Sequence, residues 1–478
     1  KNSRKFIIFA HLNFNSRNRD IMKKFTEYKQ LNLNAVADNV ANFWKANQTF
    51  KKSVETREGK PEYVFYEGPP SANGMPGIHH VMARALKDIF CRYQTQNGKQ
   101  VFRKAGWDTH GLPVELGVEK ELGITKEDIG KKITVEEYNQ ACRNAVMRYT
   151  DVWNDLTEKI GYWVDLDNPY ITYEPKYMET VWWLLKQLYN KDLLYKGYTI
   201  QPYSPKAGTG LSSHELNQPG TYRDVSDTTV VAQFSVKNLS EKASEIISNL
   251  KSQISNLSIL AWTTTPWTLP SNTALAVGRD IEYVLVKTFN QYTFEPINII
   301  LARPLLEKQF GKKFIEGTDE DFTNYTAESK TIPYQILAEF TGEDLAGTTY
   351  EQLIPWFLPA ENPEKAFRVI IGDFVTTEDG TGIVHIAPTF GADDNRVAQE
   401  NGIPPMLVKD ENDNLVPLVD LQGKFLKGEN VPELFSGKYI KNEYYDDETA
   451  PEKSWDVELA ILLKTENKAF KVEKYVHS

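Results

Sequence analysis

The sequence predicts an α/β protein in which a mixed unit is followed by a β-rich domain. A short apolar run at 63–66 leads into a glycine- and proline-rich loop, and helical periodicity then runs from Val81 to Tyr93. A strand, a glycine-rich loop and a helix open the nucleotide-binding type of α/β unit. Residues 228–390 are rich in Thr and Val, with short strands between turns, which is typical of a β-rich domain.

The composition is that of a globular protein. The chain has 478 residues, 41% of them hydrophobic and 25% charged, which is room for roughly two to four domains. No apolar run reaches the ~18 residues of a membrane span. Cys91 and Cys142 have no metal or redox spacing, and this usage predicts a cytoplasmic protein. The net charge of −10 argues, taken alone, against a nucleic-acid partner, although local basic patches also bind RNA.

The N-terminal residues are expected to lie outside the fold. We interpret residues 1–21 as a leader that is not native to it, because Met22 opens a sensible reading of the chain. A signal peptide is the alternative, but the apolar run at 7–10 is too short for one.

Further elements follow in order along the chain. Helices are predicted at Asn34–Phe43, Val135–Ile160 and Tyr177–Asn190, and the last of these carries four apolar residues expected in the core: Trp182, Trp183, Leu185 and Leu188. The segment 238–258 is rich in Ser, Lys and Asn, and predicts a short surface helix between two strands. Near the C-terminus, 460–463 and 470–472 are strand-like.

Two motifs in the first unit point to ligand binding. In the loop 66–80, small residues let a ligand approach the backbone, and the helix start after it offers free N–H groups, with His79 and His80 as further donors to phosphates. A plain turn with two surface histidines is the alternative. In 103–115, Asp108 stands between Trp and Thr in a loop and is suited to an ammonium group; the alternative is a capping aspartate.

Together these segments resemble class I aminoacyl-tRNA synthetases, the isoleucyl branch in particular. The marks are Glu-Gly-Pro-Pro at 67–70 and Gly-Trp-Asp-Thr-His-Gly-Leu-Pro at 106–113, and the resemblance runs from about residue 25 to the C-terminus. It implies a Rossmann-type ATP-binding catalytic domain, of which this chain holds the N-terminal half, interrupted by a β-rich editing domain. By the same resemblance Asp108 holds the α-ammonium of isoleucine, while Gly68 and Pro69 shape the pocket for its side chain.

The sequence departs from the family at the ATP signature. The family usually reads His-x-Gly-His at the helix start, whereas Gly77, Ile78, His79 and His80 stand here, so that glycine and the first histidine have exchanged places. Gly77, His79 and His80 are therefore the catalytic candidates of a permuted but working site. A decayed site is the alternative.

A second departure concerns metal. Many relatives carry a Cys-x-x-Cys zinc knuckle before the editing insertion, but Ser204 and Ala207 stand at the matching positions. Neither residue type is a competent zinc ligand there, so no zinc is expected. The segment Leu211–Glu215 still matches the family.

Two further motifs resemble the halves of the editing site. The first, 260–272, supplies hydroxyls suited to a ribose and a water molecule, and its candidates are Thr263, Thr264, Thr265, Thr268 and Asn272. Threonine used for strand propensity is the alternative. In the second, 380–394, the resemblance implies that Asp394 anchors the α-ammonium of a mischarged amino acid. It also implies that His385 walls the pocket so that valine fits and isoleucine does not.

The resemblance implies an enzyme that activates isoleucine with ATP and Mg²⁺ and transfers it to isoleucine-specific tRNA, acting as a monomer. Valine lacks one methylene of isoleucine, and this family is itself the standard example of how little a hydrophobic pocket gains from that difference. A second site that hydrolyses valyl-tRNA with a positioned water solves the problem; no general base is assigned. The rivals are a free-standing trans-editing hydrolase and a non-catalytic tRNA-binding relative.

The motifs and composition divide the chain into five parts. We expect the leader at 1–21, the first half of the catalytic domain at 22–200, a connecting segment at 201–227, the editing domain at 228–440, and a return toward the catalytic domain at 441–478.

Overall fold

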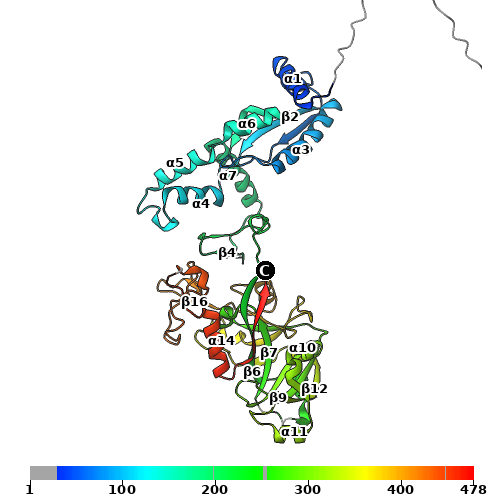
Figure 1. Cartoon of the computed structure of the whole chain (residues 1–478), viewed down its shortest axis with the longest axis vertical. Coiled ribbons are helices and arrows are strands. Elements are labelled where there is room, and N and C mark those ends of the chain that lie inside the picture. Colours follow the sequence, from blue (N-terminus) through cyan, green and yellow to red (C-terminus); the bar gives the residue numbers. More distant parts are fainter. Residues whose placement is uncertain (1–29, 198, 251–253, 255, 447) are drawn as a thin grey trace, which may run out of the picture. The chain divides into compact units, whose positions relative to one another are not determined.

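The structure is a computed structural model that describes residues 30–478 except 198, 251–253, 255 and 447. The chain divides between Tyr195 and Lys196 into two compact units (Figure 1). The leader expected at 1–21 lies outside the described residues. Among the described helices, none has both the length and the apolar character needed to cross a membrane.

The first unit is built on a three-stranded parallel sheet. Its strands β1 (Glu62–Tyr66), β2 (Gln100–Trp107) and β3 (Asp165–Ile171) lie in the order β1–β2–β3, and α3 (Ile78–Gln96) is the crossover from β1 to β2. The predicted strand, loop and helix are thus confirmed. The other helices of this unit are α1 (Leu33–Ala46), α2 (Thr49–Glu55), α4 (Leu112–Leu122), α5 (Val135–Val146), α6 (Thr150–Lys159) and α7 (Pro175–Asn190).

One predicted helix is divided into two. Thr134 caps α5 by accepting a hydrogen bond from the amide of Glu137, but the helix ends at Val146 instead of running to Ile160. The amide of Tyr149 donates to the carbonyl oxygen of Ala72, 3.0 Å away. This long-range bond takes the place of a helical one, so the prediction of a single helix over 135–160 is wrong.

The apolar faces of the first unit are less covered than the pattern suggested. Trp182 and Trp183 on α7 are 63% and 61% exposed, and Leu185 and Leu188 are each 42% exposed, so their assignment to the core is wrong. The helix itself is confirmed. The aligned apolar residues of α3 and the outer residue Val64 of β1 are exposed as well. Periodicity thus identified each element but not what covers it.

The second unit is β-rich, as predicted, and is organised by one eleven-stranded sheet. The order is β11–β12–β9–β10–β7–β15–β8–β14–β13–β6–β18, and a further pairing of β7 with β6 closes the strands from β7 to β6 into a ring. The strands are β6 (Val225–Asn238), β7 (Leu257–Thr263), β8 (Ala274–Val277), β9 (Glu282–Phe289), β10 (Pro296–Ala302), β11 (Phe314–Glu316), β12 (Ile332–Thr341), β13 (Thr349–Tyr350), β14 (Arg368–Ile371), β15 (Ile383–Ile386) and β18 (Ala469–His477).

The second unit also contains short hairpins and helices. Two hairpins are β4 (Tyr203–Ser204) with β5 (Thr209–Gly210) and β16 (Leu407–Lys409) with β17 (Leu415–Pro417). The helices are α8 (Ser213–Leu216), α9 (Glu241–Ile246), α10 (Leu306–Phe310), α11 (Asp319–Asn324), α12 (Gly342–Leu345), α13 (Ala392–Glu400) and α14 (Trp455–Thr465). The helix expected within 238–258 is therefore present as α9, between β6 and β7.

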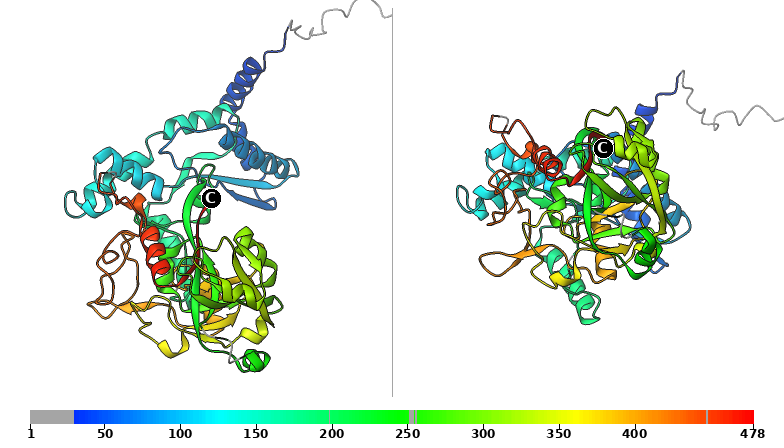
Figure 2. Two further views of the ribbon diagram at one scale, coloured as in Figure 1. Left: turned by 60° about the horizontal axis from the view of Figure 1, so that its bottom comes forward. Right: turned by 90° about the horizontal axis from the view of Figure 1, so that it is seen from below.

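The C-terminal segment differs from its prediction at one of its two expected strands. Residues 460–463 are helical rather than strand-like, because Ser454 caps α14 by accepting from the amide of Val457 and the helix buries Leu459 and Leu463. The strand expected at 470–472 is confirmed as part of β18. That strand pairs with β6 and α14 packs beside β6 (Figure 2), within the compact unit Lys196–Ser478.

Candidate functional site

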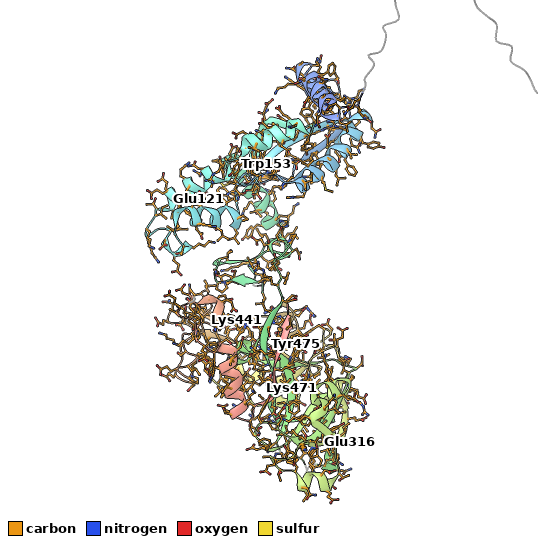
Figure 3. All side chains as sticks on the ribbon, in the orientation of Figure 1. Glu121, Trp153, Glu316, Lys441, Lys471 and Tyr475 are labelled. Atoms are coloured by element: carbon orange, nitrogen blue, oxygen red, sulfur yellow. The ribbon has the colours of Figure 1, made fainter. Side chains whose placement is uncertain are left out.

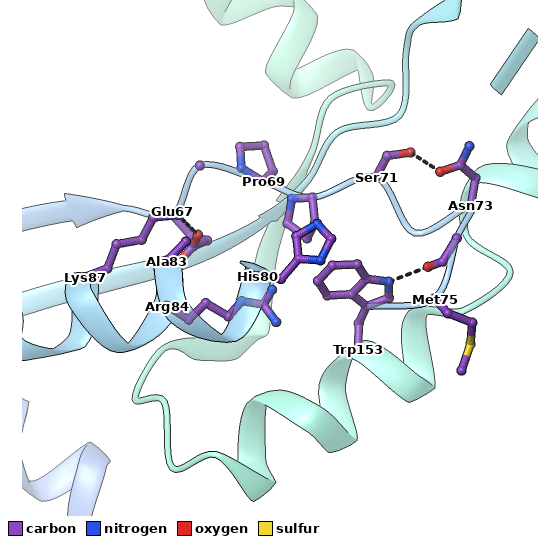
Figure 4. A pocket seen from close by; sticks show the side chains of 13 residues that line it. Glu67, Pro69, Ser71, Asn73, Met75, His80, Ala83, Arg84, Lys87 and Trp153 are labelled. Carbon is purple, nitrogen blue, oxygen red and sulfur yellow. Dashed lines mark hydrogen bonds and ion pairs between the residues drawn. The ribbon is translucent and has the colours of Figure 1, made fainter. Parts of the chain in front are cut away.

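A cavity of about 410 Å³ lies at the carboxyl end of β1, where the glycine- and proline-rich loop turns into α3 (Figure 4). Three predicted residues, Gly68, Pro69 and His80, line it. The remaining lining residues come from the loop, α3 and α6: Glu67, Pro70, Ser71, Asn73, Gly74, Met75, Ala83, Arg84, Lys87 and Trp153.

His80 is held firmly at the start of α3. The backbone amide of Gly77 donates to Nδ1 of His80 at 2.9 Å, and the ring lies edge-on to Trp153 with centroids 4.7 Å apart. Because Nδ1 is an acceptor, Nε2 carries the ring proton. Burial, His79 and Arg84 lower the pKa of His80, so the neutral form is favoured. A neutral N–H donor therefore stands at the cavity.

The exchanged residues of the signature lie just outside this cavity. His79 is exposed and its ring centroid is 3.8 Å from that of His80. A Cβ at Gly77 would lie 2.8 Å from Cε1 of His79. Glycine at 77 therefore leaves room for the imidazole of His79 as it lies in this structure.

A buried network that the sequence analysis missed supports the cavity loop. The carboxylate of Glu67 is 4% exposed and accepts hydrogen bonds from Lys87 and Tyr162. The hydroxyl of Tyr170 donates to the backbone oxygen of Glu67 at 2.6 Å, and burial raises the pKa of Tyr170 to about 12. The Tyr170 ring lies so close over Gly106 that a Cβ there would collide with it. The loop is thereby tied to α3 and to β3.

Arg84 and Trp153 were also missed. Arg84 is 6% exposed, and its guanidinium lies 4.9 Å from the ring centre of Trp153, whose Nε1 donates to the carbonyl oxygen of Gly74. A signal was present for Arg84, because it follows His80 by one helical turn and so shares its face of α3. No local pattern marks Trp153, which reaches the cavity from α6.

Asp108 lies beside the cavity loop but does not line the cavity. Its backbone amide donates to the carbonyl oxygen of Pro70 at 3.1 Å, and its Oδ1 accepts from the amide of His110 at 3.4 Å. The N-cap of α4 is Gly111, so Asp108 does not cap that helix. The carboxylate is half-buried.

The connecting segment forms a tight hairpin at Ser204 and Ala207, the two positions compared above with a zinc knuckle. Oγ of Ser204 accepts from the amide of Ala207 at 3.2 Å, and the amide of Gly208 donates to the Ser204 carbonyl oxygen at 2.8 Å. The turn is closed by these bonds. Within the described ranges, no group of three or more His, Cys, Asp or Glu side chains is arranged to hold a metal ion.

In the second unit, three of the predicted editing residues are in direct contact. Oγ1 of Thr268 lies 2.9 Å from Nε2 of His385, and Nδ2 of Asn272 lies 3.5 Å from Nδ1 of the same ring. All three are buried. The pairing of β15 with β8 and β7 brings together these two distant stretches of sequence.

The other threonines form the turn that precedes Thr268. The amide of Thr265 donates to Oγ1 of Thr263 at 3.1 Å, and the Thr268 hydroxyl donates to the carbonyl oxygen of Thr265 at 2.8 Å. Thr263 is buried, whereas Thr264 and Thr265 are half-buried. The side chain of Thr264 takes no part in these bonds.

Burial determines the charge of the two ionisable residues of this site. It lowers the pKa of His385 to about 4, so the imidazole is neutral near pH 7. It raises the pKa of Asp394, although the amide of Ala387 donates to Oδ2 at 2.9 Å. Asp394 lies in the first turn of α13, and its bond goes to a residue two positions beyond His385. A Cβ at Gly391 would lie 2.6 Å from Cγ of Asp394, which explains the glycine.

A charged pair from the C-terminal segment holds the threonine turn. The backbone amide of Trp267 donates to Oδ1 of Asp456 at 2.8 Å, and Lys441 donates to Oδ2 at 2.9 Å. Asp456 is 3% exposed. Lys441, labelled in Figure 3, also lies 3.5 Å from Asp227. No local sequence pattern marks this pair, because Lys441 and Asp456 come together only in the folded chain.

The chain has recognisable relatives. A model of the family described as tRNA synthetases class I (I, L, M and V) matches residues 39–362. The chain is 58% identical over 469 residues to the isoleucine–tRNA ligase of Bacteroides fragilis and 59% identical over 465 residues to that of Cytophaga hutchinsonii, in each case over 95% of this chain. For the isoleucine–tRNA ligase of Clostridium tetani the identity is 42% over 439 residues, or 92% of this chain. The chain spans 40% of the length of the first two relatives and 36% of the third.

Proposed function

The chain belongs to the class I tRNA synthetase family, and we propose that it acts in charging isoleucine-specific tRNA and in removing valine attached in error. The support is the similarity to isoleucine–tRNA ligases over 95% of the chain, together with two sites built by separate units. Its substrates are isoleucine, ATP and tRNA, and it works as a cytoplasmic monomer.

In the first unit, we assign isoleucine activation to the cavity and its rim, within a Rossmann-type domain. A carboxylate oxygen of isoleucine attacks the α-phosphorus of ATP, and pyrophosphate leaves. Nε2–H of His80 and the free amides at the start of α3 are suited to stabilise charge on the phosphates. Asp108 holds the α-ammonium, and Gly68 and Pro69 shape the side-chain pocket. Mg²⁺ bound with ATP would shield the phosphate charge.

In the second unit, we assign ester hydrolysis to the turn at 263–268 and to β15. A water molecule attacks the ester carbonyl of valyl-tRNA, the ester C–O bond breaks, and the terminal ribose hydroxyl leaves with a proton. Thr263, Thr264 and Thr265 orient the ribose and the water, and Asp394 binds the α-ammonium. An imidazole with a pKa of about 4 is a poor base near pH 7, so His385 serves as a wall of the pocket.

The observation that carries this assignment is the contact of Thr268 and Asn272 with His385 from a distant strand. The test is to mix the 478-residue chain with isoleucine-specific tRNA charged with either valine or isoleucine and to follow release of the amino acid. We expect the valyl ester to be hydrolysed at least tenfold faster than the isoleucyl ester. Equal rates for the two esters, or no hydrolysis of either, would overturn the proposal.

A further inference from the structure

A relay of four buried polar side chains runs through the second unit. Tyr350 and Asn272 are each 2% exposed, His385 is 7% exposed and Thr268 is 6% exposed. The hydroxyl of Tyr350 lies 2.7 Å from Oδ1 of Asn272, which links β13 to the end of the 3₁₀ helix at Pro266–Ser271. His385 lies between Asn272 and Thr268 and contacts both through its two ring nitrogens.

The direction of every hydrogen bond in this relay can be worked out. The Thr268 hydroxyl donates to the carbonyl oxygen of Thr265, so toward His385 it is an acceptor and Nε2 must carry the proton. Nδ1 is then the acceptor that faces Nδ2 of Asn272. That amide group also donates to the carbonyl oxygen of Ala274 at 2.8 Å, which leaves Oδ1 to accept from Tyr350.

We propose that Tyr350 and Asn272 are positioning residues that hold His385 as the neutral Nε2–H tautomer in one ring orientation and thereby set the size of the editing pocket. The pocket part of this inference rests on the proposed function, whereas the tautomer does not. An Asn side chain free to turn over would present its oxygen to Nδ1 and favour the other tautomer. The Tyr350 hydroxyl, which needs an acceptor at Oδ1, opposes this rotation together with the Ala274 carbonyl oxygen, which needs a donor at Nδ2.

The surroundings of Tyr350 favour a role for its hydroxyl beyond packing. Its ring is edge-on to Phe234 and Phe367, with centroids 5.4 and 6.2 Å away, so a phenylalanine would fill the same space. Burial raises the pKa of Tyr350 well above its ordinary value, which keeps the hydroxyl protonated and therefore a donor.

The first test reads the tautomer directly. In the 478-residue chain labelled with ¹⁵N-histidine, two-bond ¹H–¹⁵N correlations distinguish the tautomers of each of the seven histidines, and a His385→Gln variant assigns the relevant signal. We expect Nε2–H at His385 in the parent, a mixture of tautomers in Tyr350→Phe, and protonation of Nδ1 in Asn272→Asp. An Nδ1–H tautomer in the parent, or an unchanged pattern in both variants, would overturn the inference.

A matched control distinguishes the effect of the Tyr350 hydroxyl on the His385 tautomer from the general effect of removing a buried hydroxyl. Tyr283 is fully buried in the same unit, and its hydroxyl donates to the carbonyl oxygen of Gly382 at 2.7 Å and accepts from the amide of Gly278. Tyr283→Phe should leave the His385 signal in the Nε2–H form. A mixture of tautomers in this control as well would show that removing any buried hydroxyl in this unit disturbs His385. That result would contradict a specific positioning role for Tyr350.

The second test reads the pocket. The ratio of valyl-tRNA to isoleucyl-tRNA hydrolysis should fall about tenfold in Tyr350→Phe, the effect of losing roughly one buried hydrogen bond that fixes the wall, and should stay unchanged in Tyr283→Phe. If the parent discriminates between the esters and Tyr350→Phe discriminates equally well, the positioning role is overturned. If the parent hydrolyses neither ester, the proposed function and the pocket role fall together, while the spectra still decide the relay.

Discussion

At the scale of single residues, His385 couples the pH of the solution to the stability of the second unit. Its pKa is about 4 in the folded chain against about 6.5 in an unfolded one. As the pH falls below 6.5, the unfolded chain takes up the proton first. Stability is therefore full above pH 6.5 and is lost progressively toward pH 4, by on the order of 2 kcal/mol at pH 4.5.

Replacing His385 by Gln should remove this loss. Between pH 7 and pH 4.5, the free energy of unfolding from urea titrations should fall by on the order of 2 kcal/mol more in the parent than in the variant. Taking the difference between the parent and the variant removes the contribution of the other groups that titrate in this pH range. The same decrease in both proteins would mean that the imidazole is accessible to protons in the folded state.

The exchanged ATP signature makes a second prediction at this scale. His79 brings an imidazole to the position where the family usually has glycine under the adenine, and it lies against the ring of His80. Inhibitors shaped like the aminoacyl-adenylate should therefore bind weakly, and exchanging Gly77 and His79 should tighten their binding. Calorimetric titration of both proteins measures this, and equal dissociation constants would count against it.

At the scale of elements, the C-terminal helix α14 fixes the threonine turn through Asp456. Lys441→Met would leave this carboxylate, only 3% exposed, without its cation. Breaking a buried pair in this way costs roughly 3–5 kcal/mol. Urea denaturation should show a loss of that size, together with slower hydrolysis of valyl-tRNA because the turn is loosened.

Lys471 provides the control for this variant. It pairs with Glu473 at 3.0 Å, but both side chains reach solvent, so Lys471→Met should cost less than about 1 kcal/mol. Losses of equal size in the two variants would show that Lys441 is an ordinary surface lysine and that α14 does not hold the turn.

The sequence predicted elements well where local signals decide them and poorly where distant contacts do. The strand, loop and helix at 63–93 follow from composition and periodicity. The interruption of the helix predicted at 135–160 does not follow from them, because it depends on the hydrogen bond from Tyr149 to Ala72. Residues 460–463 have an apolar pattern that suits a strand or a helix equally, and only the Ser454 cap and the packing of α14 select the helix.

The candidate sites show the same division. The residues of the cavity loop and of the two editing motifs could be predicted because each group is contiguous in sequence. Trp153, Tyr350 and Asp456 could not, since each acts through a partner far along the chain. The family resemblance suggested the roles of the site residues, and the folded structure shows which other residues hold them in place.

At the scale of the whole molecule, burial in the first unit was predicted less well than burial in the second. The closed ring of strands gives the second unit an interior of its own, whereas the apolar faces of α3 and α7 stay exposed among the described residues. Amphipathic periodicity says that a face is apolar but not what lies on it. We assign isoleucine activation to the first unit and ester hydrolysis to the second, so mutations should affect the two activities separately.

The most direct test of that separation uses one variant in each unit of the 478-residue chain. Asp108→Ala should weaken the binding of a non-hydrolysable isoleucyl-adenylate analogue at least tenfold, and leave hydrolysis of valyl-tRNA unchanged. Asp394→Ala should do the reverse, because the variant lacks the half-buried carboxylate to which we assign the ammonium of the valyl ester, while the first unit is untouched. Calorimetry and deacylation measured on both variants give the four results. If either substitution impaired both activities, or if Asp394→Ala hydrolysed valyl-tRNA at the parent rate, the assignment of two independent sites would be contradicted.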